Sequence, residues 1–201
     1  MAFNRGEYLK FEFNKVWTSI LGKSDDYFSY MTNTNFDMLK VALSNINNII
    51  TYNSTIQLVD FIVQIFSLSV IEKNDLLTQV EKTNPNANGY DIIYSGNVKI
   101  ISEIKCNFPI NGGKRFGGAQ KKGLDKDLKI LFNGKQGLNY DDLKEYYKFL
   151  GIYRFNSNTD EAVKHYLSHL PQNYTGLVEL FNKNTVLNKN KVFVIMLNTP
   201  L

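Results

Sequence analysis

The sequence predicts a mixed α/β protein, and three observations support this prediction. Apolar residues recur at helical spacing through the first 74 residues, and no proline occurs before Pro85. Residues 90–105 contain two β-branched runs around a Ser-Gly-Asn turn, which is the pattern of a β-hairpin. Residues 192–197 are continuously apolar, as in a buried strand. With 201 residues and 43% apolar content, the chain is long enough for one domain with its own core.

The N-terminal 74 residues are expected to be helical, and a further short helix follows them. This helix is predicted to begin after Asn74 or Asp75 and to end near Glu81, before the turn-forming run at 83–89. The most apolar stretch, residues 56–71, is shorter than the about 20 residues that cross a bilayer. No secretory signal is visible at the N-terminus. We therefore expect a cytoplasmic protein with no membrane contact.

The remaining elements follow from local patterns. The hairpin strands are predicted at 90–94 and 98–105, and a glycine-rich basic loop at 107–118 follows them. An amphipathic helix is expected over 119–133, closed by Gly134. Further helices are predicted at 140–150 and 159–182, and the closing strand at 192–197. The single cysteine, Cys106, excludes a disulfide scaffold and a multi-cysteine zinc site.

Two acidic residues and a lysine are predicted to share one face of the hairpin. If a three-residue loop pairs Tyr94 with Val98, Asp91 faces the same side as Glu103 and Lys105, because side chains alternate along a strand. Burying carboxylates among apolar residues is costly unless they are paired or bind a metal. A hard divalent cation relieves their mutual repulsion, and oxygen ligands suit Mg²⁺. The pattern therefore predicts a magnesium site.

These residues resemble the motif of the PD-(D/E)xK nuclease superfamily, which includes many type II restriction endonucleases. Tyr90-Asp91 is followed, after eleven intervening residues, by Glu103-Ile104-Lys105. The resemblance implies that Asp91, Glu103 and the Ile104 carbonyl bind Mg²⁺. It also implies that Lys105 orients or polarises the attacking water and stabilises the transition state. Tyr90 stands where the family name has proline, at a position that varies within the family.

The resemblance also implies a fold and a division of the chain. The expected fold is a restriction-endonuclease-like three-layer core with a mixed central sheet, in a single domain over residues 1–201. Within it, residues 75–135 would be the catalytic core, and residues 1–74 a helical N-terminal elaboration. Residues 136–201 would supply further helices and the closing strand.

The sequence contains other acidic residues that could compete with or add to this motif. Two more Asp-x-Lys triplets, at 127–129 and 142–144, lie in helical patterns, where residues two apart point in different directions. The competing interpretation of Glu103-Ile104-Lys105 is an ordinary hairpin with an exposed Glu/Lys pair. By the same resemblance, Glu81 is a candidate metal ligand and Gln120 a candidate DNA contact. Their alternatives are a solvated helix-end glutamate and a polar residue that opens a helix.

A basic block suggests the kind of partner. Residues 97–135 contain nine basic and three acidic side chains, a surplus that exceeds the +4 of the whole chain. The candidate nucleic-acid-binding residues are, besides Gln120, Lys114, Arg115, Lys122, Lys126 and Lys129. The alternative is a solvated lysine-rich helix face and a plain flexible loop.

The expected function is Mg²⁺-dependent endonucleolytic cleavage of double-stranded DNA by a type II restriction enzyme or a similar anti-phage nuclease. Two alternatives stay open: a structure-directed repair nuclease or resolvase, and a non-catalytic nucleic-acid-binding module of the same fold. One metal centre must serve two DNA strands, so a homodimer is expected, with contacts from residues 4–71 or from the helices within 140–182. A cognate DNA methyltransferase is a further expected partner if the protein belongs to a restriction system.

Overall fold

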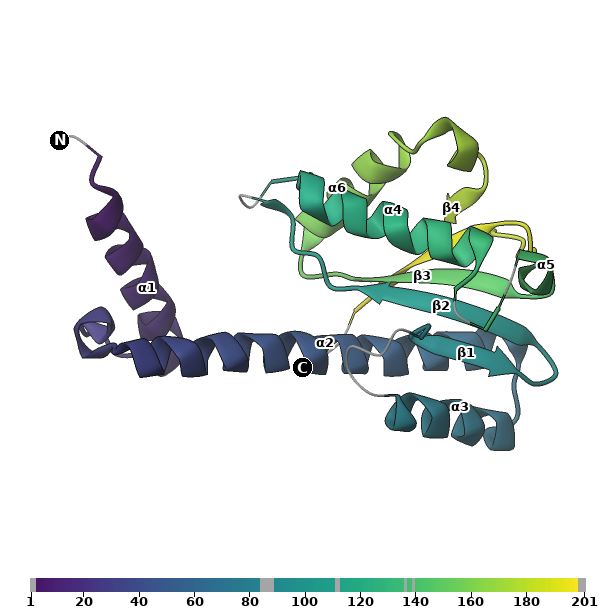
Figure 1. Ribbon diagram of the computed structural model, residues 1–201, viewed down its shortest axis with the longest axis horizontal. Helices are drawn as coiled ribbons and strands as arrows, with labels where there is room; N and C mark the ends of the chain where they lie inside the picture. Colours follow the sequence, from purple (N-terminus) through teal and green to yellow (C-terminus); the bar gives the residue numbers. More distant parts are fainter. Residues whose placement is uncertain (1–2, 84–88, 111–112, 136, 139, 199–201) are drawn as a thin grey trace. The chain divides into compact units, whose positions relative to one another are not determined.

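Figure 1 shows the computed structural model of the chain, which describes residues 3–83, 89–110, 113–135, 137–138 and 140–198. The chain divides into two compact units, with the boundary between Ile46 and Asn47. Most of the predicted turn at 83–89 and residues 111–112 of the predicted glycine-rich loop lie outside the described residues.

The first unit is helical, as predicted. Helix α1 (Arg5–Leu21) begins where the Asn4 side chain accepts hydrogen bonds from the backbone N–H groups of Gly6 and Glu7, and it ends at Gly22. Gly22 has a φ of 69°, a left-handed conformation that suits glycine. A short 3₁₀ helix, η1 (Tyr27–Tyr30), leads to the start of α2.

An aromatic cluster holds the first unit together, but much of its apolar surface stays exposed. The Phe13 ring lies 5.7 Å from Phe28 and 6.0 Å from Phe36, and it also contacts Trp17. No residue of α1 is fully buried. The exposed apolar surface of this unit includes Phe11, Val16, Ile20, Leu21, Phe36, Met38, Val41, Leu43 and Ile46.

Helix α2 (Asn33–Phe66) is longer than the apolar stretch read from the sequence. By length and composition it meets the criterion for a membrane-crossing helix, which core helices of soluble proteins also meet. Although residues 56–71 are too few to cross a bilayer, the whole of α2 is long enough, so its length does not exclude a membrane span. Within the second unit, Leu58, Val59 and Ile62 of this helix are fully buried against the sheet. These residues form one buried face on the C-terminal part of the helix, as in an amphipathic helix that packs on a sheet.

The second unit contains a five-stranded sheet of order β1-β2-β3-β5-β4. Its strands are β1 (Ile92–Ser95), β2 (Lys99–Lys105), β3 (Tyr147–Tyr153), β4 (Val178–Leu180) and β5 (Val192–Leu197). Strands β1 and β2 are antiparallel, whereas β2-β3, β3-β5 and β4-β5 are parallel. The α/β class and the mixed sheet are thus confirmed, and β5 has the predicted bounds.

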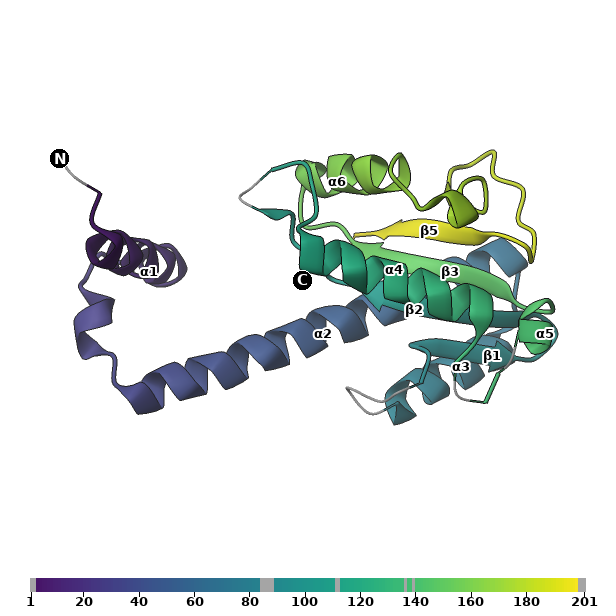
Figure 2. The same cartoon turned by 45° about the horizontal axis from the view of Figure 1, so that its top comes forward.

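Helices cover both faces of this sheet (Figures 1 and 2). Helices α4 (Gly118–Asn133) and α6 (Ser157–Leu167) pack on one face, where Leu124, Leu128 and Ala162 meet Ile101 and Leu150. Helix α3 (Val70–Lys82) and the C-terminal part of α2 pack on the other face. The prediction for α4 is confirmed to within one residue, including its end at Gly134.

The start of α3 differs from the prediction. It begins at Val70 rather than near residue 74, because Ser69 and Glu72 form a reciprocal capping box. In this motif each side chain binds the backbone N–H of the other residue, so two N–H groups without helical partners are satisfied together.

The two helices predicted at 140–150 and 159–182 are confirmed only in their first parts. Only Tyr140–Leu143 of the segment 140–150 is helical (α5), and residues 147–150 belong to β3. Phe149 packs on the α2/α3 side and Leu150 on the α4 side, so burial on both faces removes the alternation typical of half-exposed strands. In the segment 159–182, α6 ends at Leu167, and η3 (Gln172–Tyr174) and β4 follow.

The hairpin register also differs from the prediction. Tyr94 pairs with Ile100 rather than with Val98, and the three loop residues are 96–98. The shift is two residues. Because side chains alternate with period two, a shift of two residues does not change which side chains of the two strands share a face.

Candidate metal centre

The candidate site is a pocket of about 290 Å³ beside the N-terminal end of β1, within the second unit. Asp91, Glu103, Ile104 and Lys105 line it, together with Lys135 from the segment after α4. Polar side chains of α2 line the pocket as well, namely Asn48, Thr51, Tyr52 and Thr55. The structure therefore brings together the three residues that the sequence predicted to be catalytic.

Asp91 lies just before β1, where it continues the pairing with β2 through its side chain. Its Oδ2 accepts a hydrogen bond of 2.6 Å from the Ile104 N–H, and its own N–H donates to the Ser102 carbonyl. In a strand, the N–H and C=O groups of one residue point to the same edge. The Ile104 carbonyl therefore points toward the same edge as its N–H, on the side where β1 has ended. This places two oxygen donors, the Asp91 carboxylate and the Ile104 carbonyl, at one edge of the pocket.

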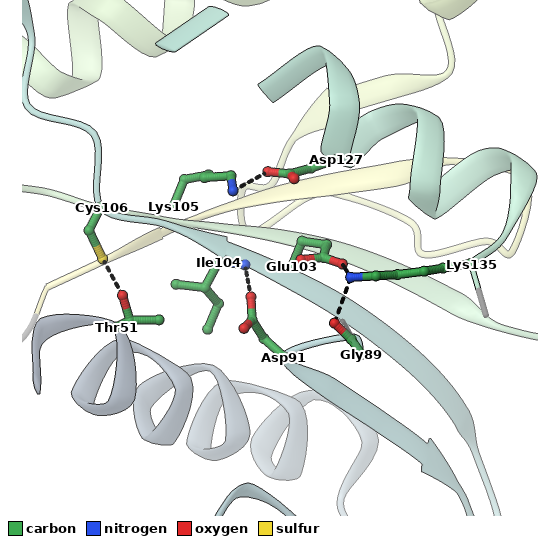
Figure 3. Close-up of polar contacts among 9 residues, drawn as sticks. All are labelled: Thr51, Gly89, Asp91, Glu103, Ile104, Lys105, Cys106, Asp127 and Lys135. Carbon is green, nitrogen blue, oxygen red and sulfur yellow. Dashed lines mark hydrogen bonds and ion pairs between the residues drawn. The ribbon is translucent and has the colours of Figure 1, made fainter. Parts of the chain in front are cut away.

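Glu103 lies on the α4 side of β2, with only 8% of its side chain exposed. Its Oε1 is 3.5 Å from the Lys135 ammonium, which also donates a 2.7 Å hydrogen bond to the Gly89 carbonyl (Figure 3). Burial, and next the negative charge of Asp91, raise the pKa of Glu103 from its ordinary 4.5 to about 7. Lys135 opposes this shift without cancelling it.

Lys105 extends toward α4, where it meets Asp127. Its ammonium is 3.0 Å from Oδ2 of Asp127, whose side chain is 5% exposed (Figure 3). This distance is that of an ion pair. Burial raises the pKa of Asp127, and Lys105 acts against this rise. Burial likewise raises the pKa of Asp91, against the effect of its hydrogen bond from Ile104.

The donor set fits Mg²⁺ better than a metal that needs a complete protein cage. No group of three or more His, Cys, Asp or Glu side chains suited to a metal occurs among the described residues. Mg²⁺ keeps several waters and is commonly held by one or two carboxylates plus substrate phosphate. Asp91, Glu103 and the Ile104 carbonyl match that requirement. Burial raises the pKa of both carboxyl groups, and the charge of Asp91 raises that of Glu103 further. Negative charge is therefore unfavourable in this pocket, and a divalent cation would compensate it.

Two other predicted site residues lie outside the pocket lining. Glu81 is exposed, and its Oε1 accepts a hydrogen bond from the hydroxyl of Tyr52. Gln120 uses both ends of its amide within the chain: Oε1 accepts from the Gly117 N–H, and Nε2 donates to the Phe108 carbonyl. These contacts connect α3 to α2 and fasten the loop before α4.

The predicted nucleic-acid-binding cations are all exposed. We call Lys114, Arg115, Lys122, Lys126 and Lys129 the basic surface. Within the described part of the chain, none of them forms an ion pair within 4.0 Å. Its three lysines lie on the side of α4 opposite the buried Leu124, Leu128 and Leu131.

The sequence prediction missed two residues of this centre. From the sequence, Lys135 is one cation of the basic block with no individual role. Asp127 belongs to an Asp-x-Lys triplet in a helical pattern, which argues against a catalytic motif there. For Asp127 a signal existed, since it falls on the apolar stripe of α4 between Leu124 and Leu128. An acidic residue on a buried stripe needs a partner. For Lys135, which follows the helix-ending Gly134, no local pattern indicates where its side chain lies.

Comparisons of this chain with protein-family models, with curated proteins and with solved structures return no match.

Proposed function

We propose that the chain is a Mg²⁺-dependent endodeoxyribonuclease with a restriction-endonuclease-like core. The observation that carries the proposal is the pocket beside β1, which is lined by the half-buried carboxylate of Asp91, the buried carboxylate of Glu103 and Lys105. The fold agrees with it, because an antiparallel β1-β2 hairpin continues into parallel strands between two helical layers. The residues that carry the motif resemblance therefore line one pocket of this fold.

The chain's residues would divide the chemistry as follows. Bound Mg²⁺ would supply positive charge to the scissile phosphate and acidify a bound water. Asp91 and Glu103 would hold the ion, helped by the Ile104 carbonyl. Lys105 would place its ammonium beside the attacking water and the phosphate oxygens, where negative charge develops. The α2 wall of the pocket would restrict which part of the substrate enters.

Binding to DNA would be driven by the basic surface. Its five cations lie on α4 and on the loop that precedes it, and this loop follows directly from β2, which carries Glu103 and Lys105. Contacts of this kind bind phosphates without reading sequence. They would bring DNA of any base sequence to the pocket, so recognition of a particular base sequence would need other residues.

A homodimer is part of this proposal, because one metal centre cleaves one strand per encounter. The exposed apolar residues of the first unit offer a contact surface, since patches of this kind mark association sites. A restriction role would imply a cognate DNA methyltransferase as partner and a cytoplasmic location.

A second candidate, a non-catalytic nucleic-acid-binding module, rests on a specific feature of the pocket. Both of its lysines contact carboxylates of the chain, Lys105 with Asp127 and Lys135 with Glu103. In a module of this kind the two pairs would serve stability alone, and the basic surface would carry the binding.

Incubation with mixed phage and plasmid DNA, with and without Mg²⁺, separates these functions. The nuclease proposal expects cleavage that needs Mg²⁺ and stops with EDTA. A mobility shift of DNA in a gel, without cleavage in the presence of any divalent cation, would favour the binding module. A preference for branched or single-stranded DNA over duplex would point to the repair nuclease or resolvase.

A further inference from the structure

We propose that Asp127 is a positioning residue for Lys105. It holds the ammonium on the α4 side of the pocket and keeps it from pairing with the two metal-binding carboxylates. The inference rests on the proposed nuclease function and adds to it a residue from α4, outside the hairpin that carries the motif.

Asp127 lies on the buried face of its helix. Leu124, Asp127, Leu128 and Leu131 are the buried residues of α4, so Asp127 is the one charged member of an otherwise apolar stripe. A buried charge without a partner is strongly destabilising. Lys105 is the partner present, with 3.0 Å between its Nζ and Oδ2 of Asp127.

Lys105 is also attracted by the other carboxylates of the pocket. Its side chain is flexible and 29% exposed, and its positive charge opposes the raised pKa of Asp127, Asp91 and Glu103. If Asp127 were neutral, the ammonium would be attracted to Asp91 and Glu103. It would then occupy the region of negative charge that Mg²⁺ needs, and it would leave the position from which it can act on water.

The contact with Asp127 leaves the ammonium able to act on a substrate. Oδ2 of Asp127 lies 3.0 Å from Nζ, and one carboxylate oxygen engages at most one of the three N–H donors of an ammonium. The pair therefore restrains the position of the ammonium while its other N–H groups stay available to other acceptors. A phosphate oxygen and a water are acceptors of the required kind.

A double-mutant cycle tests this role. The variants are Asp127→Asn, Lys105→Ala and the combination of both, with Asp125→Asn as the matched control. Asp125 lies on the same helix, but it accepts a hydrogen bond from the Tyr166 hydroxyl at 2.8 Å instead of contacting Lys105. Single-turnover cleavage of duplex DNA and its concentration dependence give the maximal rate and the apparent KM for each protein.

We expect Asp127→Asn to lower the maximal rate about ten- to hundredfold and to change the apparent KM less than threefold. The same substitution made in the Lys105→Ala protein should change the rate less than twofold, because the group being positioned is already gone. Asp127→Glu should recover part of the rate, and Asp125→Asn should stay within twofold of wild type.

Calorimetric titration with Mg²⁺ supplies a readout that does not depend on cleavage. Asp127→Asn should weaken Mg²⁺ binding severalfold, and the added Lys105→Ala substitution should restore it. An equal loss of rate in both backgrounds, or equal Mg²⁺ affinity in wild type and Asp127→Asn, would overturn the positioning role. If Asp127→Asn cleaves at the wild-type rate while Asp91→Asn is inactive, the positioning role fails and the nuclease assignment stands. If wild type shows no Mg²⁺-dependent cleavage, the nuclease assignment fails, and this role fails with it.

Discussion

Glu103 should make the metal-free protein less stable as the pH rises, and Glu103→Gln should remove that dependence. The folded pKa of about 7 lies above the ordinary 4.5 because of burial and the charge of Asp91. A group whose pKa is raised on folding favours the folded state at low pH. That contribution is lost as the pH increases from the unfolded pKa through the folded one.

The magnitude follows from the two values. The difference between 4.5 and about 7 corresponds to about 3 kcal/mol of unfolding free energy, lost in full above pH 7. The side chain is only 8% exposed, so solvent screening takes little from this figure. We expect Glu103→Gln to stabilise the protein by about 2–3 kcal/mol at pH 8 and by less than about 1 kcal/mol at pH 5.

Urea denaturation at pH 5 and pH 8 in the presence of EDTA measures this difference. Glu179→Gln is the matched control, because Glu179 also forms an ion pair, with Lys191 at 2.9 Å, but its side chain is 35% exposed. Adding Mg²⁺ at pH 8 should stabilise wild type and have little effect on Glu103→Gln. A stability difference that is the same at both pH values would show that folding does not raise the pKa of Glu103.

Four further predictions concern the metal site, the basic surface, the dimer and Lys148. Asp91→Ala or Glu103→Ala should abolish cleavage while circular dichroism shows an intact fold, and Ca²⁺ should support DNA binding without efficient cleavage; wild-type rates in either variant would contradict the metal centre. Replacing the three lysines of the basic surface by glutamine should lower the slope of log K against log salt by about three, on any DNA sequence; an unchanged slope would show a merely solvated face. Sedimentation of the protein with DNA at micromolar concentration should show a dimer that Leu43→Lys dissociates; a monomeric complex that makes double-strand breaks in one encounter would argue against the dimer. Lys148 is buried and donates to the carbonyls of Leu143, Tyr146 and Lys189, so Lys148→Met should cost about 2–4 kcal/mol in urea denaturation; a cost below about 1 kcal/mol would mean that these carbonyls find other donors.

The elements with a strong local pattern were predictable from the sequence. Helix α4 was confirmed because an apolar stripe and a closing glycine define it, and β5 because a continuous apolar run of six residues has no competing pattern. Strand β3 was missed because its burial on both faces depends on α2 and α4, which contact it only in the folded chain.

In the site, too, only contacts within one element could be predicted from the sequence. Alternation along β2 places Glu103 and Lys105 on one face, and a register error of two residues does not change which face of the hairpin they share. The contacts of Lys105 with Asp127 and of Glu103 with Lys135 connect residues 22 and 32 positions apart in the sequence. Spacing within one element cannot reveal such pairs, and the internal hydrogen bonds of Gln120 also depend on how the loop folds back.

Cleavage of plasmid DNA by Asp91→Asn and wild type, side by side in Mg²⁺, tests whether the Asp91 carboxylate holds a catalytic metal. An asparagine at this position retains an oxygen that can accept the Ile104 N–H, so the end of β1 is kept while the negative charge is removed. We expect Mg²⁺-dependent cleavage by wild type and a loss of at least about a thousandfold in the variant, as expected when the charge that holds a catalytic metal is removed. Cleavage by the variant at the wild-type rate, with equal Mg²⁺ dependence, would contradict this role of Asp91.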